Sequence, residues 1–253
     1  MRERESYDII ATEMKELSKI VKDKKCLVFL DLEGTQLTHE MIEIGAYKVI
    51  LKPDCTVKKI HKPYHAYVLP KHRVGPIVTK LTGITDLQLK REGIPYRVAL
   101  EQLKGYLGKD FYHALFVSYG TEDAHIFLQS SENNMDASTE DSRFIARRFF
   151  DLADYIGQFV RGADGNMLSL KNILNHYGVD FEGTQHNAQA DAYNLILLYK
   201  AFLEKPEIAK QGYANALAHA RFPQPVKQII ARLNEGKTVT PEEWKTLISE
   251  AVL

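Results

Sequence analysis

Four carboxylates and one histidine are placed so that they could bind divalent cations and activate a water molecule: Asp31, Glu33, Asp123, His186 and Asp191. Asp31 and Glu33 lie two residues apart at the end of the apolar run CLVFL, and alternation along a strand puts both carboxylates on one face. Two acids on a buried strand repel each other and lose solvation unless a cation lies between them. The pattern indicates a metal site; an exposed strand end with two solvated acids is the alternative.

The other three residues have ordinary explanations when each is taken alone. Asp123 is expected in the first turn of a helix, where exposed N–H groups favour an acid whether or not it binds a metal. Asp191 lies in the apolar setting of ADAYNLILLYKAFL and needs a partner there. His186 precedes that helix in a loop and could be a surface histidine, but an imidazole changes charge near neutral pH, as a general base requires.

The elements that must position these residues follow from hydrophobic periodicity. Three successive early strands predict an antiparallel meander, and two later strands alternate with helices, so we expect an α/β fold with a single mixed sheet flanked by helices. The strands are predicted at 26–34, 41–51, 65–69, 113–120 and 147–152. Helices are predicted at 7–22, 77–85, 96–108, 124–128 after a Thr121 cap, 168–178 and 190–203, with three more pieces after Pro206. The polar segment 130–142 lacks periodicity and is interpreted as a surface loop or insertion.

Composition limits the class of protein. The 253 residues, 45% of them hydrophobic, suffice for one α/β domain with appendages. The 33 basic residues balance 33 acidic ones, which argues against a protein that tracks long duplexes, though not against one that takes a short single-stranded end. Basic clusters at 22–25, 58–62 and 71–73 are interpreted as solvent-exposed surface rather than phosphate contacts.

The same composition suggests a compartment. The only two cysteines, Cys26 and Cys55, form no CxxC pair, so neither structural zinc nor a disulfide framework is indicated. The first 25 residues are too charged for a signal peptide, and no run of about 18 apolar residues occurs. We therefore expect a cytoplasmic protein that does not enter a membrane.

Three segments carry a resemblance to a known family: DLEG at 31–34, SYGTED at 118–123 and HNAQAD at 186–191. In this order they resemble the three motifs of the DEDDh 3′-to-5′ exonucleases, a superfamily with a ribonuclease H-like fold. EMIEIGAYKV at 40–49 is similar to the second strand of the family, and LTGIT at 81–85 to the turn after its third strand. Within the family the pattern resembles the stand-alone branch of ERI-type and KapD-type enzymes.

The resemblance implies a five-stranded mixed sheet and a role for each site residue. Asp31, Glu33 and Asp191 would hold one Mg²⁺ or Mn²⁺, Asp31 would bridge to a second ion, Asp123 would complete the cage, and His186 would deprotonate the attacking water. Two such ions about 4 Å apart suit an in-line displacement. Contacts to the terminal nucleotide would come from the loop after the first motif, namely Gly34, Thr35, Leu37 and Met41.

Three parts of the chain follow from the extent of the resemblance: an N-terminal helical extension at 1–23, an exonuclease domain at 24–203 and a C-terminal helical extension at 204–253. Tyr119 stands where the family often has tryptophan, which keeps an aromatic ring. The implied activity is release of nucleoside 5′-monophosphates from single-stranded or short nucleic-acid 3′ ends, with RNA slightly favoured over DNA, by a monomer or a homodimer. The alternative is a catalytically silent module that binds nucleic acid or protein with the same fold.

Overall fold

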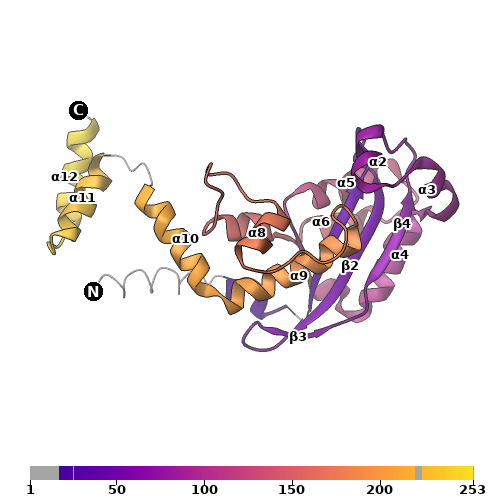
Figure 1. The fold of residues 1–253 in the computed structure, drawn as a ribbon, viewed down its shortest axis with the longest axis horizontal. Coiled ribbons are helices and arrows are strands. Elements are labelled where there is room, and N and C mark those ends of the chain that lie inside the picture. The colour runs from indigo at the N-terminus through magenta and orange to yellow at the C-terminus, as the bar shows by residue number, and fades with distance from the viewer. Residues whose placement is uncertain (1–16, 25, 220–223, 253) are drawn as a thin grey trace. The chain divides into compact units, whose positions relative to one another are not determined.

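The structure, a computed structural model, describes residues 17–24, 26–219 and 224–252 (Figure 1). The described residues up to Tyr213 form one compact unit and those from Ala214 form a second. Of the helix expected at 7–22, residues 17–22 are helical, and the remainder lies outside the described residues. Leu17 and Val21 of this helix are buried in the core of the first unit.

A mixed sheet organises the first unit, as expected. Its strands are β1 (Cys26–Gly34), β2 (Met41–Leu51), β3 (Val57–Ile60), β4 (Tyr64–Leu69), β5 (Ile94–Pro95), β6 (Ala114–Ser118) and β7 (Phe149–Asp151). They lie in the order β5-β4-β2-β1-β6-β7, with β3 also paired to β2. β1, β2 and β4 form the predicted antiparallel meander, whereas β6 runs parallel to both β1 and β7.

The sheet has seven strands where five were expected, for a local reason. β3 and β4 pair with successive parts of the same strand, β2, at Val49–Leu51 and at Glu43–Ala46 respectively. Pro63 lies between them and has no backbone N–H to donate, so one long strand becomes two. β5 adds only two residues. The mixed sheet flanked by helices is confirmed.

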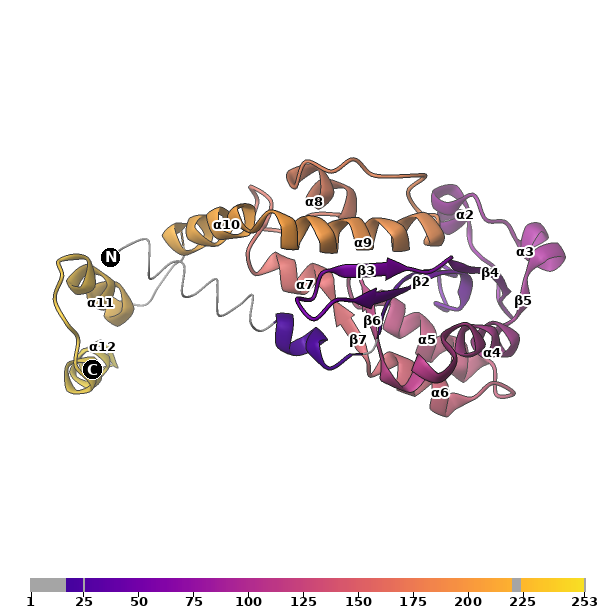
Figure 2. The same ribbon diagram turned by 90° about the horizontal axis from the view of Figure 1, so that it is seen from below.

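Helices cover both faces of this sheet. The elements before α7 are α2 (Pro76–Thr82), α3 (Asp86–Glu92), α4 (Tyr96–Leu107), a 3₁₀-helix η1 (Gly108–His113), α5 (Glu122–Asn133) and α6 (Thr139–Ala146). They are followed by α7 (Leu152–Gly157), α8 (Leu170–His176) and α9 (Ala188–Glu204). Figure 2 shows α8 and α9 on one side of the sheet and α4, α5 and α6 on the other.

β1 is buried on both faces, and its alternation links the two halves of the core. Leu27 and Phe29 belong to the cluster that includes the apolar side of α9, and Val28 and Leu30 belong to the cluster that includes α4 and α5. Because the side-chain period is two, Asp31 continues the row of Leu27 and Phe29 toward α9. Because of this alternation, side chains of α9, and not those of α4, can lie close to Asp31.

The interpretation of 130–142 as a surface loop is wrong, whereas its interpretation as an insertion stays a prediction. α5 continues to Asn133 and α6 begins at Thr139, so only a short connection between them lacks helix. Ser130 and Ser142 are buried, and their hydroxyls bond to the Met41 N–H and to the Tyr96 hydroxyl at 2.8 and 2.9 Å. The segment is a helical hairpin, and the Ser130 and Ser142 hydroxyls pair inside the protein.

The second unit contains most of the C-terminal helices. α10 (Pro206–His219) leads into it, and α11 (Gln224–Asn234) and α12 (Pro241–Val252) follow. Thr240 and Glu243 form a capping box, each backbone N–H donating to the side chain of the other residue. No helix in the described ranges is long and apolar enough to cross a membrane. Cys26 and Cys55 are free thiols and both are buried.

Candidate active site

Three of the predicted carboxylates meet at the end of β1. Asp31 and Glu33 come from the strand itself, and Asp191 comes from the first turn of α9, which packs on that face. One carboxylate oxygen from each residue lies within 4.8 Å of those of the other two. Residues separated by 160 positions in the chain are therefore close enough to share a single cation.

The N-terminus of α9 is fixed on β2 by an unusually close approach. Gly45 lies under the first turn of the helix, and a Cβ on it would come within 2.3 Å of the carbonyl carbon of Ala188. Asn187 caps the helix, its side-chain oxygen accepting from the Ala190 N–H at 2.9 Å. Glycine at position 45 thus allows α9 to bring Asp191 down to the two acids of β1.

Asp123 approaches β1 from α5. Its Oδ1 accepts the backbone N–H of Leu32 at 2.8 Å, and its side chain is buried. It therefore lies against the residue between Asp31 and Glu33, but outside the group of three carboxylates whose oxygens are within 4.8 Å. α5 begins after Thr121 as predicted, although the Thr121 side chain makes no capping hydrogen bond.

His186 ends the turn that leads into α9. Its side chain is exposed, and its φ of 61° is in the left-handed region, which is uncommon for a residue other than glycine. The backbone N–H groups of His186 and Asn187 donate to the Asp191 carboxylate. The imidazole is thus attached to the same short segment that positions Asp191, with its ring free toward solvent.

Glu43 is a site residue that the sequence analysis missed. It lies directly opposite Glu33 in the β1–β2 register and is buried. Its Oε2 accepts the Ala188 N–H at 3.1 Å, and its Oε1 accepts from the Asn187 side chain at 3.1 Å and contacts His65 Nε2 at 2.7 Å. The available signal was an acid inside the apolar run MIEIGAYKVIL, where an unpaired carboxylate is rare.

The crowding of acids changes their proton affinities. Burial, then the charges of Asp123 and Asp191, raise the pKa of Asp31 well above its ordinary range. Burial and the charge of Asp191 raise the pKa of Glu33 to about 8. Burial also raises the pKa of Asp123 to about 8 and that of Asp191 to about 6. Each of these shifts reports that the ionised carboxylates repel one another or lack water.

This donor set fits a divalent cation of the Mg²⁺ or Mn²⁺ kind. Carboxylate oxygens are the ligands that such hard cations prefer, and three of them converge here from two elements. A cation would neutralise the charges that raise these pKa values. Among the described residues, no arginine or lysine forms an ion pair with Asp31, Glu33 or Asp191.

The loop after Glu33 holds the residues predicted to contact a terminal nucleotide. Gly34 ends β1, and the Thr35 side chain is buried, its Oγ1 accepting the Glu40 N–H at 2.9 Å. Leu37 is 85% exposed and offers apolar surface beside the site. Met41 is 1% exposed and packs in the core with α4 and α5, so its side chain cannot reach a base in this structure.

Solved structures similar to this chain share its fold. The nuclease domain of 3′hExo, a DEDDh family member bound to rAMP, has a TM-score of 0.59 at 17% identity, and the match covers 72% of this chain and 93% of that one. Cell-death related nuclease 4 has a TM-score of 0.58 at 16% identity over 72% of this chain and 64% of its own. E. coli exonuclease I in complex with a dT13 oligonucleotide has a TM-score of 0.55 at 16% identity, over 73% and 42%.

At the level of sequence, no curated protein matches the chain. A family model described as Exonuclease, RNase_T, matches residues 28–199, which include every residue of the acidic site. The mixed sheet and the order of the three motifs agree with that match. The chain therefore belongs to this exonuclease family, and its fold is that of a nuclease domain described as a DEDDh family member.

Proposed function

We propose that this protein is a metal-dependent 3′-to-5′ exonuclease that releases nucleoside 5′-monophosphates from nucleic-acid 3′ ends. The observation that carries the proposal is the convergence of Asp31, Glu33 and Asp191, with ligand oxygens within 4.8 Å of one another, in a member of an exonuclease family. These three carboxylates would hold the metal, and Asp123 would support them from α5. When bound, two Mg²⁺ or Mn²⁺ ions would stabilise the charge that develops on the phosphoryl oxygens.

The remaining steps fall to side chains of the chain itself. His186, exposed on the turn before α9, would take a proton from the attacking water. The water would bond to phosphorus as the bond to the 3′ oxygen of the preceding nucleotide breaks, which leaves a shortened strand with a 3′-hydroxyl. Leu37 and the backbone of Gly34 and Thr35 would contact the terminal nucleotide.

RNA is the slightly favoured substrate. Among the similar structures, one contains rAMP and another concerns recognition of a histone mRNA stem-loop, whereas E. coli exonuclease I is bound to DNA. Single-stranded or short 3′ ends are the proposed partners, taken by a monomer or a homodimer. A cytoplasmic location is proposed with them, supported by the two free cysteines.

The test compares RNA and DNA oligonucleotides of one sequence, single-stranded and duplex, labelled at either end. A 3′-to-5′ exonuclease releases the 3′ label at once as a mononucleotide and shortens the 5′-labelled strand stepwise. Asp31→Asn should reduce both reactions to background, whereas Asp54→Asn, which changes an exposed acid in the turn at the opposite end of β2 from Glu43, should not. Equal activity of parent and Asp31→Asn would refute the proposal, and intact oligonucleotide binding without hydrolysis by the parent would favour a silent binding module.

A further inference from the structure

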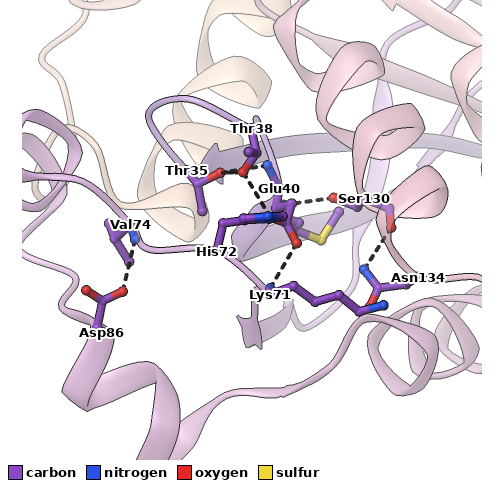
Figure 3. A network of polar contacts seen from close by, with 10 residues as sticks. Thr35, Thr38, Glu40, Lys71, His72, Val74, Asp86, Ser130 and Asn134 are labelled. Carbon is purple, nitrogen blue, oxygen red and sulfur yellow. Dashed lines mark hydrogen bonds and ion pairs between the residues drawn. The ribbon is translucent and has the colours of Figure 1, made fainter.

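The loop at residues 70–75, which we call the basic loop, is held rigidly between β4 and α2. Glu40 is a fully buried acid that accepts the Lys71 N–H at 2.9 Å and contacts His72 Nδ1 at 2.5 Å (Figure 3). Val74 donates its N–H to Asp86 Oδ1 at 2.9 Å. The loop is thus fixed near its start by Glu40 and near its end by α3.

The basic loop is also hydrogen-bonded to the loop that follows Glu33 at the end of β1. The Gln36 N–H donates to the Val74 carbonyl at 2.9 Å, and the Gln36 side chain accepts the Ile77 N–H at 3.1 Å. Glu40 itself exchanges backbone and side-chain hydrogen bonds with Thr35, only two residues after Glu33. Gln36 follows Glu33 by three residues, which span at most roughly 10 Å of extended chain, and Val74 is hydrogen-bonded to Gln36. Val74 therefore lies at most about two further residue lengths beyond that distance from Glu33.

Three unpaired cations surround a hollow at this loop. Lys71 and Arg73 line it together with Lys90 from α3, and its volume is about 350 Å³. Among the described ion pairs none involves these three side chains, whereas Lys48, Arg97 and Lys104 each have an acidic partner. The one acid in the lining, Asp86, already accepts the Val74 N–H through Oδ1.

A charge run on a protein surface is usually only solvated, and this was our interpretation of 71–73 from the sequence. Two features separate this loop from such a surface. Its backbone is fixed by hydrogen bonds from the β1–β2 loop and α3, and all three cationic residues belong to the lining of one hollow. A preorganised set of cations next to the active site suits an anion that is part of the substrate.

We propose that Lys71, Arg73 and Lys90 bind a backbone phosphate of the substrate strand other than the phosphate that is cleaved. The inference rests on the proposed nuclease function and extends it to a second point of attachment. The acidic site holds the scissile phosphate through metal, and the basic loop holds its neighbour through direct charge. Together the acidic site and the basic loop would fix the orientation of the nucleic-acid strand. A strand held through a single phosphate could rotate about that contact.

The test uses full-length parent, the Lys71→Ala/Arg73→Ala double variant and a control, Lys58→Ala/Lys59→Ala. The control removes the same charge from exposed residues of β3, which pairs with the opposite end of β2 from Glu43. Fluorescence anisotropy without metal gives the Kd for a single-stranded hexanucleotide. We expect Kd to rise at least about tenfold in the double variant only, because loss of a single charge-assisted hydrogen bond already predicts a factor of this size. The slope of log Kd against log salt should fall by about 0.7 for each lost phosphate contact.

Substrate length separates this site from the acidic site. A dinucleoside monophosphate has one phosphate, the scissile one, so its KM and kcat should be the same in parent and double variant, while KM for the hexanucleotide rises. Equal losses on both substrates, or an unchanged Kd for the hexanucleotide, would overturn the proposal. A third result would also overturn it: inorganic phosphate binds the parent tightly and the double variant poorly, while the hexanucleotide Kd is the same for both. The hollow would then be a site for free phosphate.

The binding measurement is independent of catalysis. If the parent hydrolyses no substrate, the proposed function fails, yet the hexanucleotide Kd still reports on the basic loop. Both substituted side chains, Lys71 and Arg73, are exposed, so we expect the fold to stay intact. Thermal unfolding of each variant checks this.

Discussion

Glu43 accepts the backbone N–H of Ala188 at 3.1 Å and so ties the second strand to the first turn of α9. The same carboxylate accepts from the Asn187 side chain, the residue that caps the helix. The segment that carries both His186 and Asp191 is therefore held by an acid outside the five predicted residues. The position of the histidine depends on β2 as much as on α9.

Glu43→Gln should lower kcat without preventing the metal from binding. A glutamine side chain has one oxygen that can accept a hydrogen bond. Its NH₂ group would face either the Ala188 N–H or the Asn187 side chain, both of which donate to Glu43, and that hydrogen bond would be lost. Loss of such supporting contacts typically costs about 10- to 100-fold in activity. Steady-state hydrolysis with metal titration checks this, and Glu101→Gln on the exposed side of α4 is the matched control. A Glu43→Gln variant with the kcat of the parent would show that the contact does not position the site.

His186→Ala should lose most of its turnover while it retains metal affinity, because the proposed base and the metal ligands are separate groups. General-base contributions are roughly 10² to 10⁴ in rate. Since His186 has a φ of 61°, His186→Asn is a useful second variant, as asparagine tolerates this conformation better than alanine. Isothermal titration with Mn²⁺ measures metal binding, and His113→Ala serves as the control. Weakened metal binding in both His186 variants would contradict this division of roles.

Metal-free protein should become less stable as pH rises from about 4 to 8. The folded pKa of Glu33 is raised from 4.5 to about 8 and that of Asp123 from 3.8 to about 8, so the folded state holds protons that the unfolded chain has released. Stability therefore falls with pH across this interval, since the folded state binds more protons. Saturating Mg²⁺ should remove much of the fall, because a cation replaces the protons.

Thermal unfolding at several pH values, with chelator or with Mg²⁺, measures this effect. The informative quantity is the difference between the two conditions, because other groups titrate in both. Metal binding should also release protons above pH 6, seen as a dependence of the binding enthalpy on the buffer. A Mg²⁺-induced stabilisation that does not grow with pH would contradict the assignment of the raised pKa values to the metal site.

Gly45→Ala should destabilise the protein and reduce hydrolysis together. The added Cβ would meet the backbone of Ala188 and Gln189 at 2.3 Å, so α9 must shift away from β2 and carry Asp191 with it. Overpacking of this kind costs roughly 1 to 3 kcal/mol. Chemical denaturation and an activity assay check the two effects. Gly105→Ala in α4, where no atom lies within 4 Å of the added Cβ, should be neutral or stabilising.

The sequence predicted the parts of the site that depend on local periodicity. Asp31 and Glu33 could be assigned to one face because strand alternation is a local rule, and Asp191 could be placed at a helix start from the residues around it. Their convergence on one point followed from the family resemblance rather than from the pattern. Glu43 was missed because its partners, the Ala188 N–H, the Asn187 side chain and the His65 ring, lie 145, 144 and 22 residues away in the chain, and no local rule identifies them.

The errors have a common physical origin in polar groups that pair inside the protein. Ser130 and Ser142 made their segment look like a loop, yet each hydroxyl has a partner on another element. Conversely, Met41 looked available to a nucleotide because it follows the first motif, but the Ser130 contact draws its backbone toward α5 and its side chain into the core. Polarity predicts exposure only where no buried partner exists.

The alternation of β1 also determines which changes in length this protein can tolerate. Leu27 and Phe29 share their face with Asp31 and Glu33, so a single residue inserted before Asp31 would turn both acids toward α4. The turn at 52–56 between β2 and β3 lies at the other end of β2, where a change in length does not alter the face on which either acid lies. Natural variation in chain length should therefore accumulate at that turn and be absent from the nine residues of β1.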